Sequence, residues 1–563
     1  MPILRQQQSM ARFKDAVIYQ IYPRSFADSN GDGIGDLPGI LSRLDYLADL
    51  GVDVLWLSPV FASPNADNGY DISDYEAIMP QFGTMADFDA LLTGVHQRGM
   101  RLVLDLVVNH SSDEHDWFAQ SRSSKTNPYR DYYIWRPPSG TGGPPNNYQS
   151  FFSGPAWQFD EPTGEYYLHL FAKKQPDLNW EHQPLREAIY RMMRFWFDKG
   201  IDGFRMDVIP FLSKDPAFPD YPANRYGDLT IYANGPRIHE FLAEMNREVL
   251  QHYPCMTIGE GFGVSAEQAN LYVGRDRHEL NMIYHFDHAV PREEQRFVDP
   301  APEFTLPQLK AVFARWNDAI GTDGWQNIYF GNHDNPRLLS RFGSPERFPR
   351  ESATLLATVL LTQRGTPTIY QGDELGMTNC RFESIDEFDD IQVKNAWQTL
   401  IATGQYPADV FLETANRIAR DHARTPMQWT DALGAGFTAG IPWLKVNPNY
   451  MSINVAQQEA DPQSVLNFYR RLIQWRKQMP VLHEGLCHDL LPDHPAIWAF
   501  DRTLVNERLV MVANVSEEPS ELPAPLIESR LMTTPVFANY NADFLNTLRP
   551  YEVRVYDLKA QKA

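Results

Sequence analysis

The stretch RLVLDLVVNH, residues 101–110, is a continuous apolar run that ends in polar residues. A run without polar alternation indicates a strand that is covered on both faces, as in a parallel sheet. The segment before it, TMADFDALLTGVHQRG (84–99), begins at a capping threonine and repeats apolar residues at helical spacing. The pattern therefore predicts a helix followed by a buried parallel strand.

The same alternation extends in both directions along the chain. Strands are predicted at 16–23, 52–59, 101–109, 203–207, 256–260, 281–287, 327–334 and 366–374. Helices are predicted at 37–51, 84–99, 185–199, 234–250 and 464–479. Eight strands with intervening helices predict an α/β fold, the (β/α)8 TIM barrel. An open doubly wound sheet is the alternative, but no G-x-G-x-x-G follows the first strand.

Two long interruptions and a final segment suggest further domains. We expect barrel domain A to comprise 1–109 and 179–482, with an insertion at about 375–463. The inserted domain B would span 110–178, after strand 3, because so long a loop in a compact barrel is usually functional. The remainder, 483–563, has short alternating runs that predict a small antiparallel β domain.

Composition excludes several classes of protein. The 563 residues include 72 acidic and 50 basic side chains, a net charge of −22, whereas a nucleic-acid surface needs the opposite sign. The sequence contains no run of 18 apolar residues, so it predicts no membrane-spanning helix. The start lacks an apolar signal core, and the three cysteines are widely spaced, so we expect a cytoplasmic protein with reduced thiols.

Acidic residues stand where the predicted strands end, which is where TIM barrels place their active sites. Asp207, Glu260 and Asp334 come at the ends of three different strands. A single such carboxylate would more often be a helix cap or a salt-bridge partner. Three that converge on one barrel mouth indicate a functional site, because buried carboxylates are costly unless paired or used. Binding of a metal by these three carboxylates is the competing interpretation, but the sequence lacks an HEXXH motif and the Cys/His spacing of a metal site.

A second pattern, DSNGDGIGD (28–36), places oxygen ligands at alternate positions, as at the start of an EF-hand loop. The predicted ligands are Asp28, Asn30, Asp32, the carbonyl of Ile34, and Asp36. The twelfth place, Gly39, has no carboxylate, so the sequence predicts a cation site that is not an EF-hand. A solvated turn is the alternative.

The segments DLVVNH (105–110), GFRMD (203–207), GE (259–260) and NHD (332–334) resemble the four conserved segments of the α-amylase superfamily, glycoside hydrolase family 13. The chain looks most like the branch of oligo-1,6-glucosidases, dextran glucosidases and sucrose isomerases. This resemblance implies a barrel domain A, an inserted domain B and a C-terminal β-sandwich. It also implies that the loop at 28–36 holds a structural Ca²⁺, or Mg²⁺, rather than a regulatory ion.

The resemblance further implies roles for the carboxylates. Retaining glycosidases need a nucleophile and an acid/base about 5–5.5 Å apart. These would be Asp207 and Glu260, with Asp334 stabilising the positive charge of the transition state, while Arg205 would keep Asp207 ionised. The remaining substrate-binding residues implied by the resemblance are Asp67, Tyr70, His110, Phe152, Phe171, Gln175, Val208, His333 and Arg420.

We therefore expect a monomeric, retaining α-glucosidase that releases glucose from the ends of short α-1,6-linked or sucrose-like substrates. Pairing of Arg420 with Asp67 would close the pocket beyond the terminal sugar. Val208 is similar to members that cleave α-1,6 bonds, although Gln392 stands where several of them have glutamate. A sucrose isomerase or another transglucosylase is the alternative, but VPRE (290–293) replaces the arginine-bracketed loop of the isomerases. A non-catalytic relative is the remote alternative.

Overall fold

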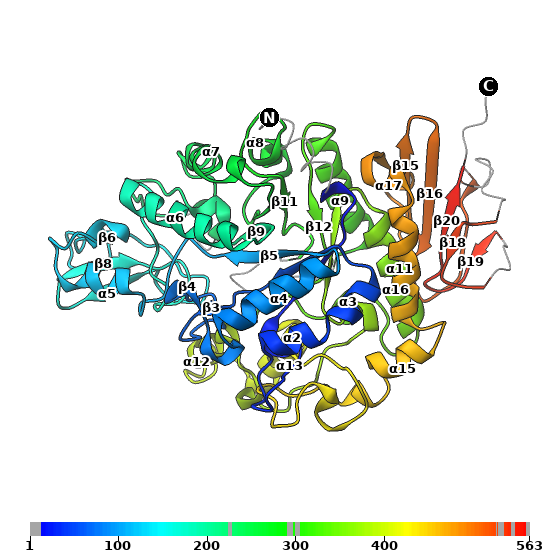
Figure 1. Ribbon diagram of the computed structural model, residues 1–563, viewed down its shortest axis with the longest axis horizontal. Coiled ribbons are helices and arrows are strands. Elements are labelled where there is room, and N and C mark those ends of the chain that lie inside the picture. The colour runs from blue at the N-terminus through cyan, green and yellow to red at the C-terminus, as the bar shows by residue number, and fades with distance from the viewer. Residues whose placement is uncertain are drawn as a thin grey trace.

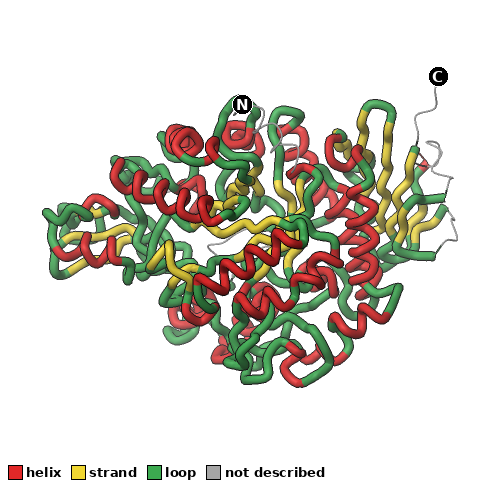
Figure 2. Tube along the Cα trace, in the orientation of Figure 1, coloured by secondary structure: helices red, strands yellow, loops and turns green. Residues whose placement is uncertain are grey.

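The computed structural model describes residues 13–222, 228–289, 297–298, 304–524, 526, 534–541 and 546–558. A central ring of strands is surrounded by helices, and a smaller group of strands lies at each end of the long axis (Figure 2). Among the described residues, no helix is both long enough and apolar enough to cross a membrane.

The central sheet is the predicted barrel. Its eight parallel strands are β1 (Ile18–Ile21), β2 (Val54–Leu57), β5 (Arg101–Leu106), β9 (Gly203–Met206), β10 (Met256–Glu260), β11 (Met282–Tyr284), β12 (Asn327–Ile328) and β13 (Thr366–Tyr370). They pair in the order β11-β10-β9-β5-β2-β1-β13-β12. A parallel bridge between Ile283 and Gln326 joins the two end strands and closes the ring. The TIM-barrel prediction is thus confirmed.

Helices cover the outside of the barrel, as the sequence predicted. They include α4 (Met85–Gln97), α6 (Gln183–Lys199), α7 (Ile238–Glu248), α9 (Leu306–Ile320), α11 (Pro349–Thr362) and α16 (Val465–Lys477). Helix α4 begins with the capping box formed by Thr84 and Asp87. The prediction of one continuous helix at 37–51 is wrong. It is divided into α2 (Leu37–Ser42) and α3 (Leu44–Leu50), because Arg43 leaves the helical region at φ −110° and ψ 7°.

An insertion between β5 and α6 projects from one end of the barrel (Figure 1). It contains α5 (Asp116–Ser123) and a three-stranded sheet of β6 (Trp135–Arg136), β7 (Trp157–Asp160) and β8 (Glu165–Leu168). His110 and Asp177 form an antiparallel bridge, so the two ends of the insertion lie side by side. The region after β13 contributes α12 (Ile391–Leu400), α13 (Ala408–Ile418), α14 (Asp421–Arg424) and α15 (Val455–Ala460).

The C-terminal part lies at the opposite end of the barrel (Figure 1). Its larger antiparallel sheet contains β14 (Leu486–Asp489), β15 (Ile497–Leu504), β16 (Glu507–Asn514), β18 (Phe537–Ala538) and β20 (Val553–Asp557). A second sheet pairs β17 (Ser520–Glu521) with β19 (Thr547–Leu548). Arg502 on β15 is buried and donates to the carbonyls of Thr362 and Gln363 at the end of α11, which ties this part to the barrel.

Candidate active site

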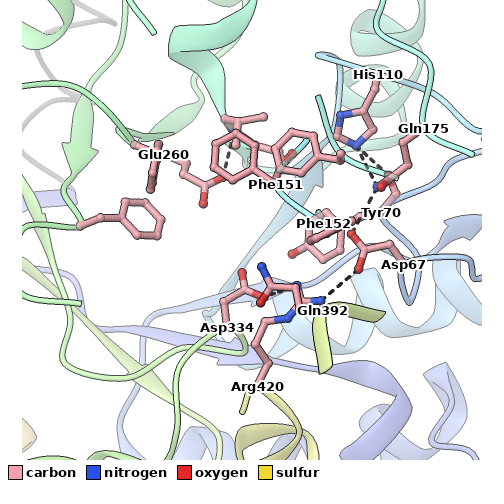
Figure 3. A pocket seen from close by; sticks show the side chains of 15 residues that line it. Asp67, Tyr70, His110, Phe151, Phe152, Gln175, Glu260, Asp334, Gln392 and Arg420 are labelled. Atoms are coloured by element: carbon pink, nitrogen blue, oxygen red, sulfur yellow. Dashed lines mark hydrogen bonds and ion pairs between the residues drawn. The ribbon is translucent and has the colours of Figure 1, made fainter. Parts of the chain in front are cut away.

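A pocket opens at the carboxyl ends of the barrel strands, beneath the insertion (Figure 3). It is lined by Asp67, Tyr70, His110, Phe151, Phe152, Phe171, Gln175, Asp207, Val208, Glu260, Phe262, Phe286, Asp334, Gln392 and Arg420. All three predicted catalytic carboxylates therefore face one space. Of the predicted substrate-binding residues, Arg205 and His333 lie beneath this surface and contact residues that line it.

The floor of the pocket is organised by the guanidinium of Arg205, which is 1% exposed. Its Nη1 donates to Asp207 Oδ1 at 2.7 Å, and its Nη2 lies 2.7 Å from Glu260 Oε2. One buried cation therefore holds both carboxyl groups. Asp207 follows β9 and Glu260 ends β10, and these two strands are neighbours in the barrel. Residues far apart in the sequence therefore meet at this point.

The charge of Glu260 acts directly on the carboxyl group of Asp207. Burial and the neighbouring charge of Glu260 raise the pKa of Asp207 well above its ordinary value, while Arg205 opposes the shift. Two carboxyl groups held by one buried guanidinium cannot both ionise as freely as in water, which favours the protonated form of one of them. An acid and an anion in one site are what acid-assisted displacement at a sugar carbon requires.

Asp334 occupies a strongly cationic corner. Its Oδ1 accepts from Arg424 at 3.0 Å and from Arg420 at 3.3 Å, and its Oδ2 lies 3.1 Å from His333 Nε2. Burial alone would raise the pKa of Asp334, but these neighbours outweigh it and hold the pKa well below the usual range. The arginines supply the permanent charge, because burial lowers the pKa of His333 to about 3. Asp334 is thus an anion at neutral pH.

The far end of the pocket is closed by Arg420. Its Nη2 lies 3.4 Å from Asp67 Oδ1, and Asp390 accepts from its Nε and Nη2 at 2.5–3.1 Å. Gln175 donates to the other Asp67 oxygen at 3.3 Å. Burial raises the pKa of Asp67 to about 6, even though Arg420 and Arg424 lower it. Figure 3 shows Asp67 and Arg420 side by side at one end of the pocket.

Two neutral histidines support the same wall. His333 Nδ1 lies 2.8 Å from the amide nitrogen of Gln20, so Nδ1 accepts and Nε2 carries the proton that faces Asp334. Tyr70 stacks on His333 with ring centroids 5.2 Å apart and donates its hydroxyl to Asp105. Burial lowers the pKa of His110 to about 3, and its Nε2 lies 3.1 Å from the Tyr70 carbonyl. Both rings thus donate a hydrogen bond within the site, to Asp334 and to the Tyr70 carbonyl, without adding charge.

Aromatic side chains form the upper wall. Phe171 stacks on Phe151 at 4.8 Å and meets Phe152 edge-on at 5.8 Å, and Phe152 lies 5.4 Å from the Arg420 guanidinium. Phe262 and Phe286 contact each other at 5.5 Å, on the Glu260 side of the pocket. Such faces suit the apolar faces of a sugar ring.

Sequence reasoning missed Phe151, Phe262, Phe286 and Asp390. The phenylalanines have no polar signature, although Phe151 adjoins the predicted Phe152 and Phe262 follows Glu260 by two residues. Asp390 is the N-cap of α12, and its side chain accepts from the Gln392 N–H. From the sequence it could be predicted only as a helix cap, not as a partner of Arg420. The VPRE segment (290–293) lies outside the described residues.

The predicted cation loop is partly buried and rich in turns. The side-chain oxygens of Asp28, Asn30 and Asp32 each accept from the backbone N–H two residues on, at 2.8–2.9 Å. Asp36 is buried and its two oxygens accept from Ser29 and Gly39. The Ile34 carbonyl belongs to the same turn-rich loop, which packs closely on residues 438–442, since a Cβ on Gly33 would meet the Ile441 carbonyl at 1.8 Å.

Comparison with known proteins gives one consistent relationship. The sequence profile described as the α-amylase catalytic domain matches residues 20–485. An oligo-1,6-glucosidase of Halalkalibacterium halodurans is 51% identical, over 97% of this chain and 98% of its own. A glucan 1,6-alpha-glucosidase of Streptococcus pneumoniae is 45% identical, over 90% of this chain and 92% of its own. The isomaltulose synthase of Protaminobacter rubrum superposes with a TM-score of 0.92 at 45% identity, covering 97% of this chain and 99% of its own.

Proposed function

Because the chain belongs to the α-amylase family of glycoside hydrolases, we propose that it is a retaining, exo-acting α-glucosidase. Its substrates are short α-glucosides with α-1,6 bonds, with sucrose or related disaccharides as further candidates. The observation that carries the proposal is the Asp207–Glu260 pair, held by Arg205 on the floor of a pocket whose far end Arg420 closes. A pocket closed in this way accepts a terminal glucose and excludes the interior of a long chain.

In this proposal Asp207 attacks the anomeric carbon while Glu260 protonates the leaving oxygen. Arg205 lies 2.7 Å from an oxygen of each carboxyl group and opposes the raised pKa of Asp207, so it supports Asp207 in its role as the attacking anion. A covalent β-glucosyl-enzyme forms, and Glu260 then deprotonates the water that releases glucose with retained configuration. Asp334, an anion between two arginines, stabilises the oxocarbenium-like charge.

The remaining pocket residues bind the terminal glucose. Asp67 and Arg420 bind hydroxyls at its non-reducing end, helped by Gln175, and Tyr70 stacks against the ring. His110 and His333 support these residues as neutral rings, His110 at the Tyr70 carbonyl and His333 at Asp334 from beneath the pocket. Phe152, Phe171 and Val208 shape the wall, and Arg205 orients the carboxylates from below.

A sucrose isomerase is the second candidate, favoured by one observation. Phe262 and Phe286 present aromatic faces on the Glu260 side of the pocket, where a leaving fructose would stay stacked and attack again. The 45% identity to an isomaltulose synthase supports this candidate, but the 51% identity to an oligo-1,6-glucosidase favours hydrolysis.

Chromatography of the products decides between them. We expect isomaltose to give two glucose molecules, and sucrose, if cleaved, to give mainly free glucose and fructose. Isomaltulose or trehalulose as the main product from sucrose, with isomaltose untouched, would establish the isomerase instead.

We also propose that the loop at 28–36 binds a structural Ca²⁺, with Mg²⁺ as the alternative. Three carboxylates, one amide oxygen and one backbone carbonyl form an all-oxygen donor set of the kind that hard cations prefer. Within the described residues no group of three His, Cys, Asp or Glu side chains is placed to hold a metal, so the Asn30 and Ile34 oxygens are essential to this proposal. A cytoplasmic enzyme is proposed on the absence of disulfides among the described cysteines.

A further inference from the structure

The contacts of Arg205 account for all of its hydrogen-bonding capacity. A guanidinium has five N–H donors in a rigid plane. Nη1 donates to Asp105 Oδ1 and to Asp207 Oδ1, both at 2.7 Å. Nη2 lies 2.7 Å from Glu260 Oε2 and also donates to the hydroxyl of Tyr284 at 2.7 Å. Nε donates to the same Tyr284 hydroxyl at 3.0 Å.

Tyr284 differs from the other three acceptors in being neutral and in spanning one whole edge of the guanidinium. Strand register explains how it comes to lie there. On β10 and β11, Glu260 pairs directly with Tyr284, while on β5 and β9, Asp105 pairs directly with Arg205. The barrel therefore places an acceptor at each of two opposite edges of the Arg205 guanidinium, Asp105 at one and Tyr284 at the other. Tyr284 is 2% exposed and is not among the residues that line the pocket.

We propose that Tyr284 is a positioning residue for glycoside cleavage, which fixes the rotation of Arg205 so that Nη1 faces Asp207 and Nη2 faces Glu260. The proposal rests on the proposed function. The phenol accepts from Nε and Nη2 at once, so a rotation of the guanidinium within its plane would break at least one of these bonds. Asp105 alone cannot prevent that rotation, because it contacts only Nη1.

Loss of the hydroxyl would leave two N–H donors of a cation that is 1% exposed without an acceptor, which is costly at a buried position. The nearest remaining acceptors are the carboxylates, and Glu260 is already in contact with Nη2. The guanidinium would turn toward Glu260 and stabilise the ionised form of the Asp207–Glu260 pair. A carboxyl group that gains a closer contact with a cation gives up its proton at a lower pH, and the alignment of Asp207 would worsen.

The test is Tyr284→Phe, which removes one oxygen and keeps the ring. We expect kcat for isomaltose to fall about 10- to 100-fold, as small displacements of catalytic groups do, with KM changed less than threefold. The basic limb of the pH–rate profile should move to lower pH. The matched control is Tyr329→Phe. Tyr329 is also buried and packs edge-on against Tyr284 at 5.2 Å, but it donates to the backbone carbonyl of His285.

Wild-type kinetics and an unmoved pH profile in Tyr284→Phe would overturn the proposal, as would equal losses in Tyr284→Phe and Tyr329→Phe. All rates are repeated with p-nitrophenyl α-glucoside, which reports glucosylation of Asp207 whether the natural product is glucose or an isomer. Failure of the proposed function would instead appear in the products of the wild-type enzyme.

Discussion

The backbone N–H of Val208 donates a hydrogen bond of 2.8 Å to Glu260 Oε2. Val208 does so from a left-handed conformation, φ 34° and ψ 42°, that a β-branched residue rarely adopts. Backbone strain of this kind costs about 1–3 kcal/mol and persists where the surrounding structure imposes it. The residue after Asp207 thus positions Glu260, so the two carboxyl groups are linked through the chain as well as through Arg205.

Azide tests the assignment of the two carboxyl groups. Asp207→Ala should lose activity by several orders of magnitude, and azide should restore turnover by attacking from the vacated face, giving β-glucosyl azide. In Glu260→Ala, azide should attack the glucosyl-enzyme and give the α-azide. The configuration of each product is read by NMR, and the opposite pairing would mean that the roles are exchanged.

Chelation tests the loop at 28–36. A cation that binds only the folded state stabilises it by about 2.7 kcal/mol at a concentration 100-fold above its Kd. We therefore expect EDTA to lower the melting temperature of the wild type by a few degrees, and excess Ca²⁺ to restore it. Asp32→Ala should melt at the lower temperature with or without EDTA. The exposed Asp276→Ala is the control, and a wild type that is insensitive to EDTA would exclude the site.

Acid should destabilise the fold through buried histidines. His285 stacks on Trp316 at 4.4 Å, and burial lowers its pKa to about 4. The unfolded chain binds this proton below about pH 6.5 and the folded chain does not, so stability falls as the pH drops from 6.5 toward 4. The loss contributed by this group is about 2 kcal/mol at pH 5.

Replacing that imidazole should flatten the pH dependence. His285→Phe keeps an aromatic ring on Trp316, and we expect a smaller drop in melting temperature between pH 7 and pH 5 than in the wild type. The exposed His278→Asn should retain the wild-type drop. Identical drops in all three proteins would show that His285 does not titrate as its burial implies.

Arg502 should be essential for attaching the C-terminal part. It is 1% exposed and donates to four carbonyls, those of Thr362, Gln363, Leu482 and Gly485, at 2.8–3.0 Å. Arg502→Met would leave these acceptors unpaired, so we expect about 3 kcal/mol or more of lost stability in urea unfolding. Arg508→Met, at a half-exposed arginine that pairs with Asp501, should cost less than Arg502→Met, because Arg508 keeps contact with solvent and donates to no such set of carbonyls. Equal effects would contradict the attachment role.

The sequence predicted the barrel well because each strand has its own apolar run, and strand ends in a barrel meet at one mouth. Asp207, Glu260 and Asp334 could therefore be placed together from spacing alone. The break at Arg43 could not be predicted, because nothing in its neighbours marks a change of backbone. The contact between Tyr284 and Arg205 could not be predicted either, because it depends on the register between β10 and β11.

The pair formed by Asp67 and Arg420 has a consequence for the bulk behaviour of a polymer solution. An enzyme whose pocket is sealed behind one sugar removes single residues and never severs a backbone. In a dextran solution the viscosity would then stay almost constant while glucose accumulates. The initial rate would follow the molar concentration of dextran molecules rather than their mass, so two preparations of equal weight but different length would be consumed at different speeds.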